Sequence, residues 1–167
     1  TALTYPYGLA IDAQSNLYVA DYANHRVVMF PSLSNTATRV YGQPSFTTSN
    51  FGTGPTGMRN PTFLTLDGAG NLYVSDSGNH RILFFPSGQT SATRVFGQLG
   101  SMTSATPNLG GVSSESLNFP AGLIVTANGN LVAADSGNNR VLVFENVALV
   151  VNVPAGQNVV INGDAGI

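Results

Sequence analysis

Three aspartate–arginine pairs recur at one spacing, and they are the residues of this sequence best suited to chemistry. In each set an arginine follows an aspartate by five positions, with an asparagine between them: Asp21, Asn24 and Arg26; Asp76, Asn79 and Arg81; Asp135, Asn138 and Arg140. As functional groups, the carboxylates would be general bases or metal ligands. As structural groups, each carboxylate would pair bidentately with its guanidinium across a turn whose conformation the asparagine supplies. A catalytic site is a single asymmetric constellation, so we interpret the three sets as structural turn clamps.

The other polar candidates are too few and too scattered for a catalytic or metal site. His25 and His80 occupy one motif position whose third equivalent is Asn139, and two imidazoles fall short of the three protein ligands of a catalytic zinc. The ionisable groups outside the recurring positions are Arg59, Glu115, Glu145 and Asp164, and their spacing does not indicate paired-carboxylate hydrolysis. We therefore predict no catalytic residue, no bound metal and no cofactor in this chain.

Composition excludes several other classes of function. Of the 167 residues, 43% are hydrophobic and 8% are charged, and the net charge is −2. All six basic residues are arginines, so no basic stripe is available and we expect no nucleic-acid partner. No apolar run reaches the length of a membrane span, so we expect no membrane insertion. The absence of cysteine excludes disulfides and thiolate chemistry.

Short apolar strands must position the clamps, because the whole chain is built from one repeated unit. Asp76 follows Asp21 by 55 positions and Asp135 follows Asp76 by 59. Each copy reads as four strands of four to six residues, bounded by Gly, Asn, Asp, Ser and Pro. Both faces of the strands are apolar, so neighbouring sheets must cover them. The pattern predicts an all-β propeller of four-stranded antiparallel blades, with three blades at about 5–60, 61–119 and 120–167.

The same motifs resemble a known repeat family. Asn24-His25-Arg26-Val27 and Asn79-His80-Arg81-Ile82 resemble the NHL repeat, and Asn138-Asn139-Arg140-Val141 is a weaker match. The preceding Leu-Tyr-Val-x-Asp and the Pro-x-Gly-Leu opening also fit this family. The resemblance implies a β-propeller, usually six-bladed, and related enzymes such as amidating lyases place zinc ligands near the ring centre. Three blades cannot close a ring. We therefore expect either a stretch of a longer propeller or a ring completed by another chain.

Two long connections and the C-terminal end stand outside the blade pattern. The loops 44–60 and 99–119 are expected on the face that carries the clamp turns, either as a recognition surface or as straps over outer-strand edges. Their candidate binding residues are Phe46, Phe51, Arg59, Met102 and Glu115. The third copy departs from the pattern at 148–153, its expected outer strand. An extra apolar strand at 158–162, with Val159, Val160 and Ile161, is a candidate for assembly with another chain.

These observations favour a non-catalytic extracellular or cell-surface propeller module, for binding or for self-assembly into a scaffold or fibre. Low charge and Ser/Thr/Asn/Gly-rich loops are typical of bacterial secreted or surface proteins. The expected partners are further copies or further blades, with a protein or a glycan as ligand. The alternative is half of a six-bladed enzyme, a lyase or a lactonase-like hydrolase, whose catalytic residues lie outside this chain.

Overall fold

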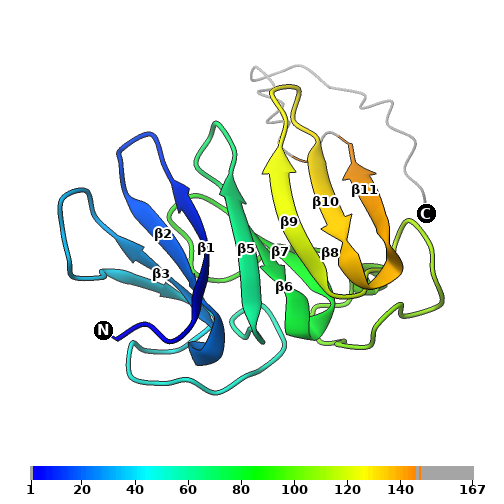
Figure 1. The fold of residues 1–167 in the computed structure, drawn as a ribbon, viewed down its shortest axis with the longest axis horizontal. Coiled ribbons are helices and arrows are strands. Elements are labelled where there is room, and N and C mark those ends of the chain that lie inside the picture. Colours follow the sequence, from blue (N-terminus) through cyan, green and yellow to red (C-terminus); the bar gives the residue numbers. More distant parts are fainter. Residues whose placement is uncertain (1, 146, 148–167) are drawn as a thin grey trace, which may run out of the picture.

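Three antiparallel sheets, called blades 1 to 3, make up the computed structural model, which describes residues 2–145 and 147 (Figure 1). Blade 1 contains β1 (Pro6–Ile11), β2 (Leu17–Asp21), β3 (Arg26–Phe30) and β4 (Arg39–Tyr41). Blade 2 contains β5 (Pro61–Leu66), β6 (Leu72–Asp76), β7 (Arg81–Phe85) and β8 (Arg94–Phe96). Blade 3 contains β9 (Pro120–Val125), β10 (Leu131–Asp135) and β11 (Arg140–Phe144).

In each blade the strands pair in chain order, as in a meander. The helical segments among the described residues are four 3-10 turns: η1 (Tyr22–Asn24), η2 (Ser77–Asn79), η3 (Gln98–Gly100) and η4 (Ser136–Asn138). None of the described helices is long and apolar enough to cross a membrane. The all-β propeller fold predicted from the sequence is confirmed. The fourth strand expected at 148–153 and the candidate assembly residues Val159, Val160 and Ile161 lie outside the described residues.

The hydrophobic core lies between the blades, as the apolar character of both strand faces requires. One cluster joins blades 1 and 2 and includes Tyr18, Val27, Leu64 and Leu83. A second cluster joins blades 2 and 3 in the same way through equivalent positions. The sheet faces that neighbouring blades turn toward each other are therefore stabilised by burial against one another rather than by a covering helix.

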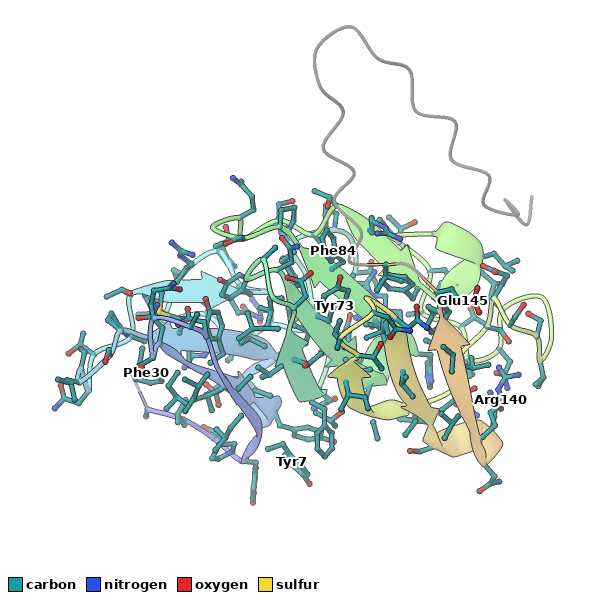
Figure 2. The ribbon with its side chains drawn as sticks, turned by 90° about the horizontal axis from the view of Figure 1, so that it is seen from above. Tyr7, Phe30, Tyr73, Phe84, Arg140 and Glu145 are labelled. Atoms are coloured by element: carbon teal, nitrogen blue, oxygen red, sulfur yellow. The ribbon has the colours of Figure 1, made fainter. Side chains whose placement is uncertain are left out.

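The blades fan out so that their first strands, β1, β5 and β9, run side by side along the inner edge (Figure 1). The hairpins between first and second strands lie at one end of the fan. The clamp turns η1, η2 and η4 and the two long loops lie at the other end, which we call the clamp face. Seen from above, the three sheets follow one another like blades of an incomplete ring (Figure 2).

Candidate functional site

The structure brings each aspartate and arginine of the three clamps together at the end of the second and third strands of a blade. Strand pairing sets Asp21 opposite Arg26, and the other two pairs are opposite in the same way. In every pair the arginine Nε lies 2.7 Å from the aspartate Oδ2. The Asp76–Arg81 pair is fully buried, whereas the Arg140 side chain is 25% exposed. The clamps are charge-assisted hydrogen bonds that hold the hairpin ends.

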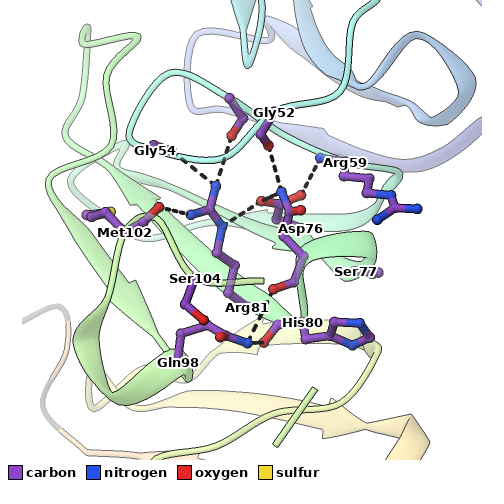
Figure 3. Close-up of polar contacts among 12 residues, drawn as sticks. Gly52, Gly54, Arg59, Asp76, Ser77, His80, Arg81, Gln98, Met102 and Ser104 are labelled. Atoms are coloured by element: carbon purple, nitrogen blue, oxygen red, sulfur yellow. Dashed lines mark hydrogen bonds and ion pairs between the residues drawn. The ribbon is translucent and has the colours of Figure 1, made fainter. Parts of the chain in front are cut away.

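The pairing is not bidentate, because the remaining guanidinium nitrogens hold loops instead. Arg81 donates to the carbonyl of Met102 in the loop after its blade and to the carbonyls of Gly54 and Gly57, at 3.1 and 3.0 Å, in the loop before it (Figure 3). Arg140 similarly donates to two carbonyls of the preceding loop, at 2.6 and 2.7 Å. The expectation of a bidentate pair was therefore wrong, and each arginine ties the clamp to the loops around it.

Arg26 follows the same scheme in blade 1. It donates to the carbonyl of Phe46 at 2.5 Å and to that of Ala2 at 3.1 Å. The second oxygen of each clamp carboxylate, Oδ1, accepts a backbone N–H from just before the first strand, from Thr4, Arg59 and Asn118 respectively, at 2.6–2.7 Å. Each clamp thus joins the ends of the second and third strands to the chain before the first strand and to at least one long loop.

The clamp asparagines act as donors rather than as the turn residues. Asn79 Nδ2 lies 2.8 Å from Asp76 Oδ2, and Asn24 and Asn138 donate to their own aspartates. The left-handed residue of each turn is the next one, with φ of 54° at His25, 55° at His80 and 52° at Asn139. This too corrects the sequence interpretation, which gave the turn conformation to the asparagine.

The surroundings of Asp76 leave no room for a reacting molecule. Burial raises the pKa of its carboxyl, and the Arg81 guanidinium with the hydrogen bonds from Arg59 N and Asn79 opposes that rise. Both oxygens face donors, and the side chain is fully buried. The recurring carboxylates are therefore placed for structure rather than for proton transfer to a substrate.

The two histidines join each blade to the next. Asn60 N donates to His25 Nδ1 at 3.1 Å, and Phe119 N donates to His80 Nδ1 at 3.2 Å. Both rings make edge contacts with a phenylalanine, Phe51 for His25 and Phe119 for His80. Among residues 2–145 and 147, no group of three or more His, Cys, Asp or Glu side chains could hold a metal ion. Because Nδ1 accepts a backbone N–H in both cases, each imidazole acts as a hydrogen-bond acceptor between blades.

Protonating these imidazoles should weaken the fold. Burial first, and then the Arg59 charge, lower the pKa of both His25 and His80 below 6.5. At pH 7.5 both imidazoles are neutral in the folded and in the unfolded chain. Below about pH 6.5 the imidazoles of the unfolded chain take up protons before those of the folded chain do, so the free energy of unfolding falls. We expect the urea midpoint to drop between pH 7.5 and 5.5. A His25→Asn/His80→Asn variant, carrying the residue of the third repeat, should lose most of that dependence; an unchanged slope would contradict this role.

On the side of the molecule opposite the clamp face, two more aspartates close the hairpins between the first and second strands. Asp12 accepts bonds from Asn16 and from the Tyr18 hydroxyl, which lies 3.3 Å away, and Asp67 accepts equivalent bonds from Asn71 and Tyr73. Burial acts to raise the pKa of Asp12, but the hydrogen bonds it accepts outweigh burial and lower it. These repeated carboxylates also serve the blade itself.

The candidate loop residues divide into packed and exposed groups. Phe46 packs against the apolar residues of blade 1, and Met102 packs against the core between blades 1 and 2. Phe51, Arg59 and Glu115 are exposed on the clamp face. The Arg59 guanidinium lies 5.0 Å from the centre of the Phe51 ring and points away from the clamp (Figure 3). The loops are therefore anchored at their bases and still present a charged and aromatic surface.

Two glutamines that the sequence reasoning did not single out fix these loops. Gln98 Nε2 donates to the carbonyls of His80 and Thr106, at 3.0 and 2.8 Å, and Gln43 Nε2 donates to those of His25 and Asn50. The loop 44–60 also reaches the outer part of blade 2, where Ala92 N bonds the carbonyl of Pro55. The sequence signal for the two glutamines is that Gly42-Gln43 and Gly97-Gln98 occur 55 positions apart, at the same place in the first two repeats. The contacts favour the strap interpretation for most of each loop.

The two outermost sheet faces, one on blade 1 and one on blade 3, expose apolar residues in the part of the chain that the structure describes. The blade-1 face is the side of blade 1 turned away from blade 2. Leu9 and Ile11 on its inner strand are exposed, whereas Val19 and Val28 in its middle are buried and pack against Phe46 of the 44–60 loop. Phe30 marks this end of the molecule in Figure 2. The blade-3 face is the side of blade 3 turned away from blade 2, and its residues are Ile124, Val132, Ala134, Val141 and Val143. An apolar groove crosses the blade-3 face beside Phe63.

Comparison with known proteins gives a family and a fold. The profile of the NHL repeat matches residues 3–30, 58–85 and 117–144. No curated protein sequence gives a significant match. Among solved structures, a streptogramin B lyase is 13% identical with a TM-score of 0.52, and the match covers 84% of this chain and 40% of that one. A protein of unknown function from Bacteroides caccae is 13% identical with a TM-score of 0.55, covering 84% and 46%.

A third solved structure, an inactive H270A virginiamycin B lyase from Staphylococcus aureus with quinupristin, is 15% identical with a TM-score of 0.49, covering 84% and 41%. The chain therefore spans less than half the length of each of these structures. At these identities the likeness concerns the fold.

Proposed function

This chain belongs to the NHL-repeat family, and on that premise we propose that it is a non-catalytic module for binding and assembly whose three blades join further blades. The observation that carries the proposal is the exposed apolar surface at both ends, made by the blade-3 face and by Leu9 and Ile11 of the blade-1 face. Single exposed apolar residues are ordinary, but a contiguous apolar sheet face is typical of a surface that another protein covers. The repeated ionisable groups support the same proposal, because their hydrogen-bonding atoms are engaged within the blades.

The exposed part of the clamp-face loops is the proposed recognition surface. The Arg59 side chain has no counterpart in the other repeats, where its position is held by Thr4 and Asn118, and the contact common to the three clamps is made by its backbone N–H alone. Its guanidinium therefore remains on the surface beside Phe51. A guanidinium beside an aromatic ring suits a protein or glycan ligand. We place the module outside the cell or at its surface, on the basis of its low charge and its polar loops.

A second proposal comes from the fold likeness to a streptogramin B lyase, of which this chain spans 40%. On that alternative the chain is half of a six-bladed lyase or hydrolase, with its catalytic residues in other blades. Metal analysis of the intact assembly, followed by an activity assay with and without a chelator, separates the two. A bound metal whose removal abolishes turnover would favour the enzyme.

Sedimentation velocity over a wide range of protein concentrations tests the assembly proposal. We expect species heavier than the 17.3 kDa of one chain, because the two apolar faces should be covered in solution. A compact 17.3 kDa species at every concentration would overturn this function.

A further inference from the structure

We propose that two copies of this chain pair head to tail into a closed six-bladed ring, with the blade-3 face of each copy on the blade-1 face of the other. The inference rests on the proposed assembly function, since it names the assembly partner. It follows from comparing each outermost face with the internal interfaces at the same repeat positions.

The blade-3 face has the same design as the faces by which blades 1 and 2 pack on their successors. Its central residue is Val141, the second residue of β11, which is 64% exposed. The second residues of β3 and β7 are Val27 and Ile82, and both are 0% exposed, within the interfaces between successive blades. Blade 3 therefore presents the surface that meets a following blade.

The blade-1 face is the matching counterpart. Leu9, the fourth residue of β1, is 62% exposed. Its equivalents Leu64 and Leu123 are 5% and 7% exposed, because each packs against the preceding blade. The Leu9 part of the blade-1 face is therefore the surface that would meet a preceding blade, beside Val19 and Val28, which already pack against Phe46 of the same chain. One chain carries both halves of the interface that it already uses twice internally.

The hydrogen bond that links successive blades, which we call the latch, has its acceptor position in blade 3 and its donor position before blade 1. Inside the chain, His25 and His80 each accept the N–H of a left-handed residue before the next blade, Asn60 and Phe119. In blade 3 the latch position holds Asn139, which is exposed. The residue that would meet it in a second copy is Tyr5, whose φ of 52° matches the 48° of Asn60 and the 47° of Phe119. The side-chain amide oxygen of Asn139 takes the place of the histidine Nδ1, and in the pair it accepts the backbone N–H of Tyr5 of the second copy.

A serine hydroxyl repeats the same relation. Ser77 Oγ donates to the carbonyl of Pro120 in the next blade, at 2.5 Å, and Ser77 is buried. Its equivalent in blade 3 is Ser136, which is exposed, and the equivalent of Pro120 in blade 1 is Pro6. In the paired ring the Ser136 hydroxyl bonds the carbonyl of Pro6 of the partner.

Ring size selects two copies. Propellers typically have 4–8 blades, so two copies give six blades and close, whereas three copies give nine and exceed the range. A twofold axis through the ring centre makes both contacts identical, so a head-to-tail interface closes here instead of extending into a filament. The competing possibility is that a fourth blade of a longer polypeptide covers the blade-3 face. In that case this chain alone would not pair with a second copy.

The test is sedimentation equilibrium of the chain and of face variants. We expect the wild-type chain at twice the mass of one chain. Val141→Arg and Leu9→Arg should each raise the dissociation constant at least about 100-fold, because each buries an unpaired charge in both contacts. Both side chains are largely exposed in a single chain, so both variants should fold, which near-ultraviolet circular dichroism checks. Leu33→Arg, at a fully exposed apolar position outside both faces, is the matched control and should pair normally.

Mixing the two variants identifies the head-to-tail arrangement. Val141→Arg retains its blade-1 face and Leu9→Arg retains its blade-3 face, so an equal mixture should form a heterodimer through one intact contact. An isologous pairing of like faces would give no such rescue and would overturn the inference. Asn139→His, which installs the latch residue of the other blades, should tighten pairing, and Asn139→Ala should weaken it.

The remaining outcomes separate this inference from the assembly function. Open-ended oligomers that both arginine substitutions abolish would overturn the closed pair and leave the assembly function standing. A dimer that resists both substitutions would also overturn the pairing by these faces. A wild-type chain that remains a monomer throughout would overturn both.

Discussion

Replacing Arg81 with methionine is expected to lower the free energy of unfolding by about 3–5 kcal/mol, the loss typical when one partner of a buried ion pair is removed. The change leaves the Asp76 carboxylate buried without its counter-charge. It also removes the donor for the carbonyls of Gly54, Gly57 and Met102, which fix two loops. Urea unfolding at one fixed protein concentration measures the effect, since association changes the apparent stability.

Arg140→Met is the matched control. Arg140 makes the same 2.7 Å contact, but its side chain is 25% exposed, so water can compensate part of the loss. We expect it to cost clearly less than Arg81→Met. Adding Asp76→Asn to Arg81→Met should recover part of the stability, because the unpaired charge is then gone. Equal losses at both arginines, or no recovery in the double variant, would contradict the clamp as the source of the effect.

The fold was predictable because the repeated sequence pattern indicates the same strands locally and the same packing of sheets in all three copies. Strand length, bounding turn residues and two apolar faces occur three times in register, and only stacked sheets bury both faces. The aspartate–arginine clamps were predictable for the same reason. Their geometry was not, because the sequence does not show that loop carbonyls compete for the guanidinium nitrogens of Arg26, Arg81 and Arg140.

The loops were predictable as loops but not in their contacts. Long polar segments contain no periodic signal, and their backbone carbonyls, which make the contacts to the clamps, are present at every residue. Gln43 and Gln98 were visible as a repeated pair, yet only the structure shows that their amides hold the loop to the histidine turn. The same limit applied to His25 and His80, whose inter-blade bonds depend on residues about 35–39 positions away.

Repeat equivalence also separates two kinds of exposed residue. Val141 and Leu9 are exposed where their equivalents are buried, which indicates a missing neighbour. The exposed side chains of Phe51 and Arg59 take no part in the contacts shared by the three blades, and they form the recognition surface that we propose. The proposed assembly and the proposed ligand binding therefore use different surfaces, and substitutions in one should leave the other intact.

Replacing Met58 with alanine is expected to lower the free energy of unfolding by about 2–5 kcal/mol, the range for truncating a large buried apolar side chain. Met58 is 0% exposed and belongs to the core between blades 1 and 2. It packs tightly under Gly42, where a Cβ atom would lie 2.7 Å from Met58 Cγ, so truncation removes side-chain atoms that are in close contact with this glycine. Urea unfolding measures the loss.

Phe51→Ala in the same loop is the control that separates anchoring from recognition. Phe51 is 64% exposed, so its removal should change stability by no more than about 0.5 kcal/mol. If the loop acts as both strap and recognition surface, Met58→Ala lowers stability, whereas Phe51→Ala leaves stability unchanged and weakens binding of a ligand to the clamp face. A large stability loss at Phe51, or a negligible one at Met58, would mean that the loop is anchored elsewhere than at its buried methionine.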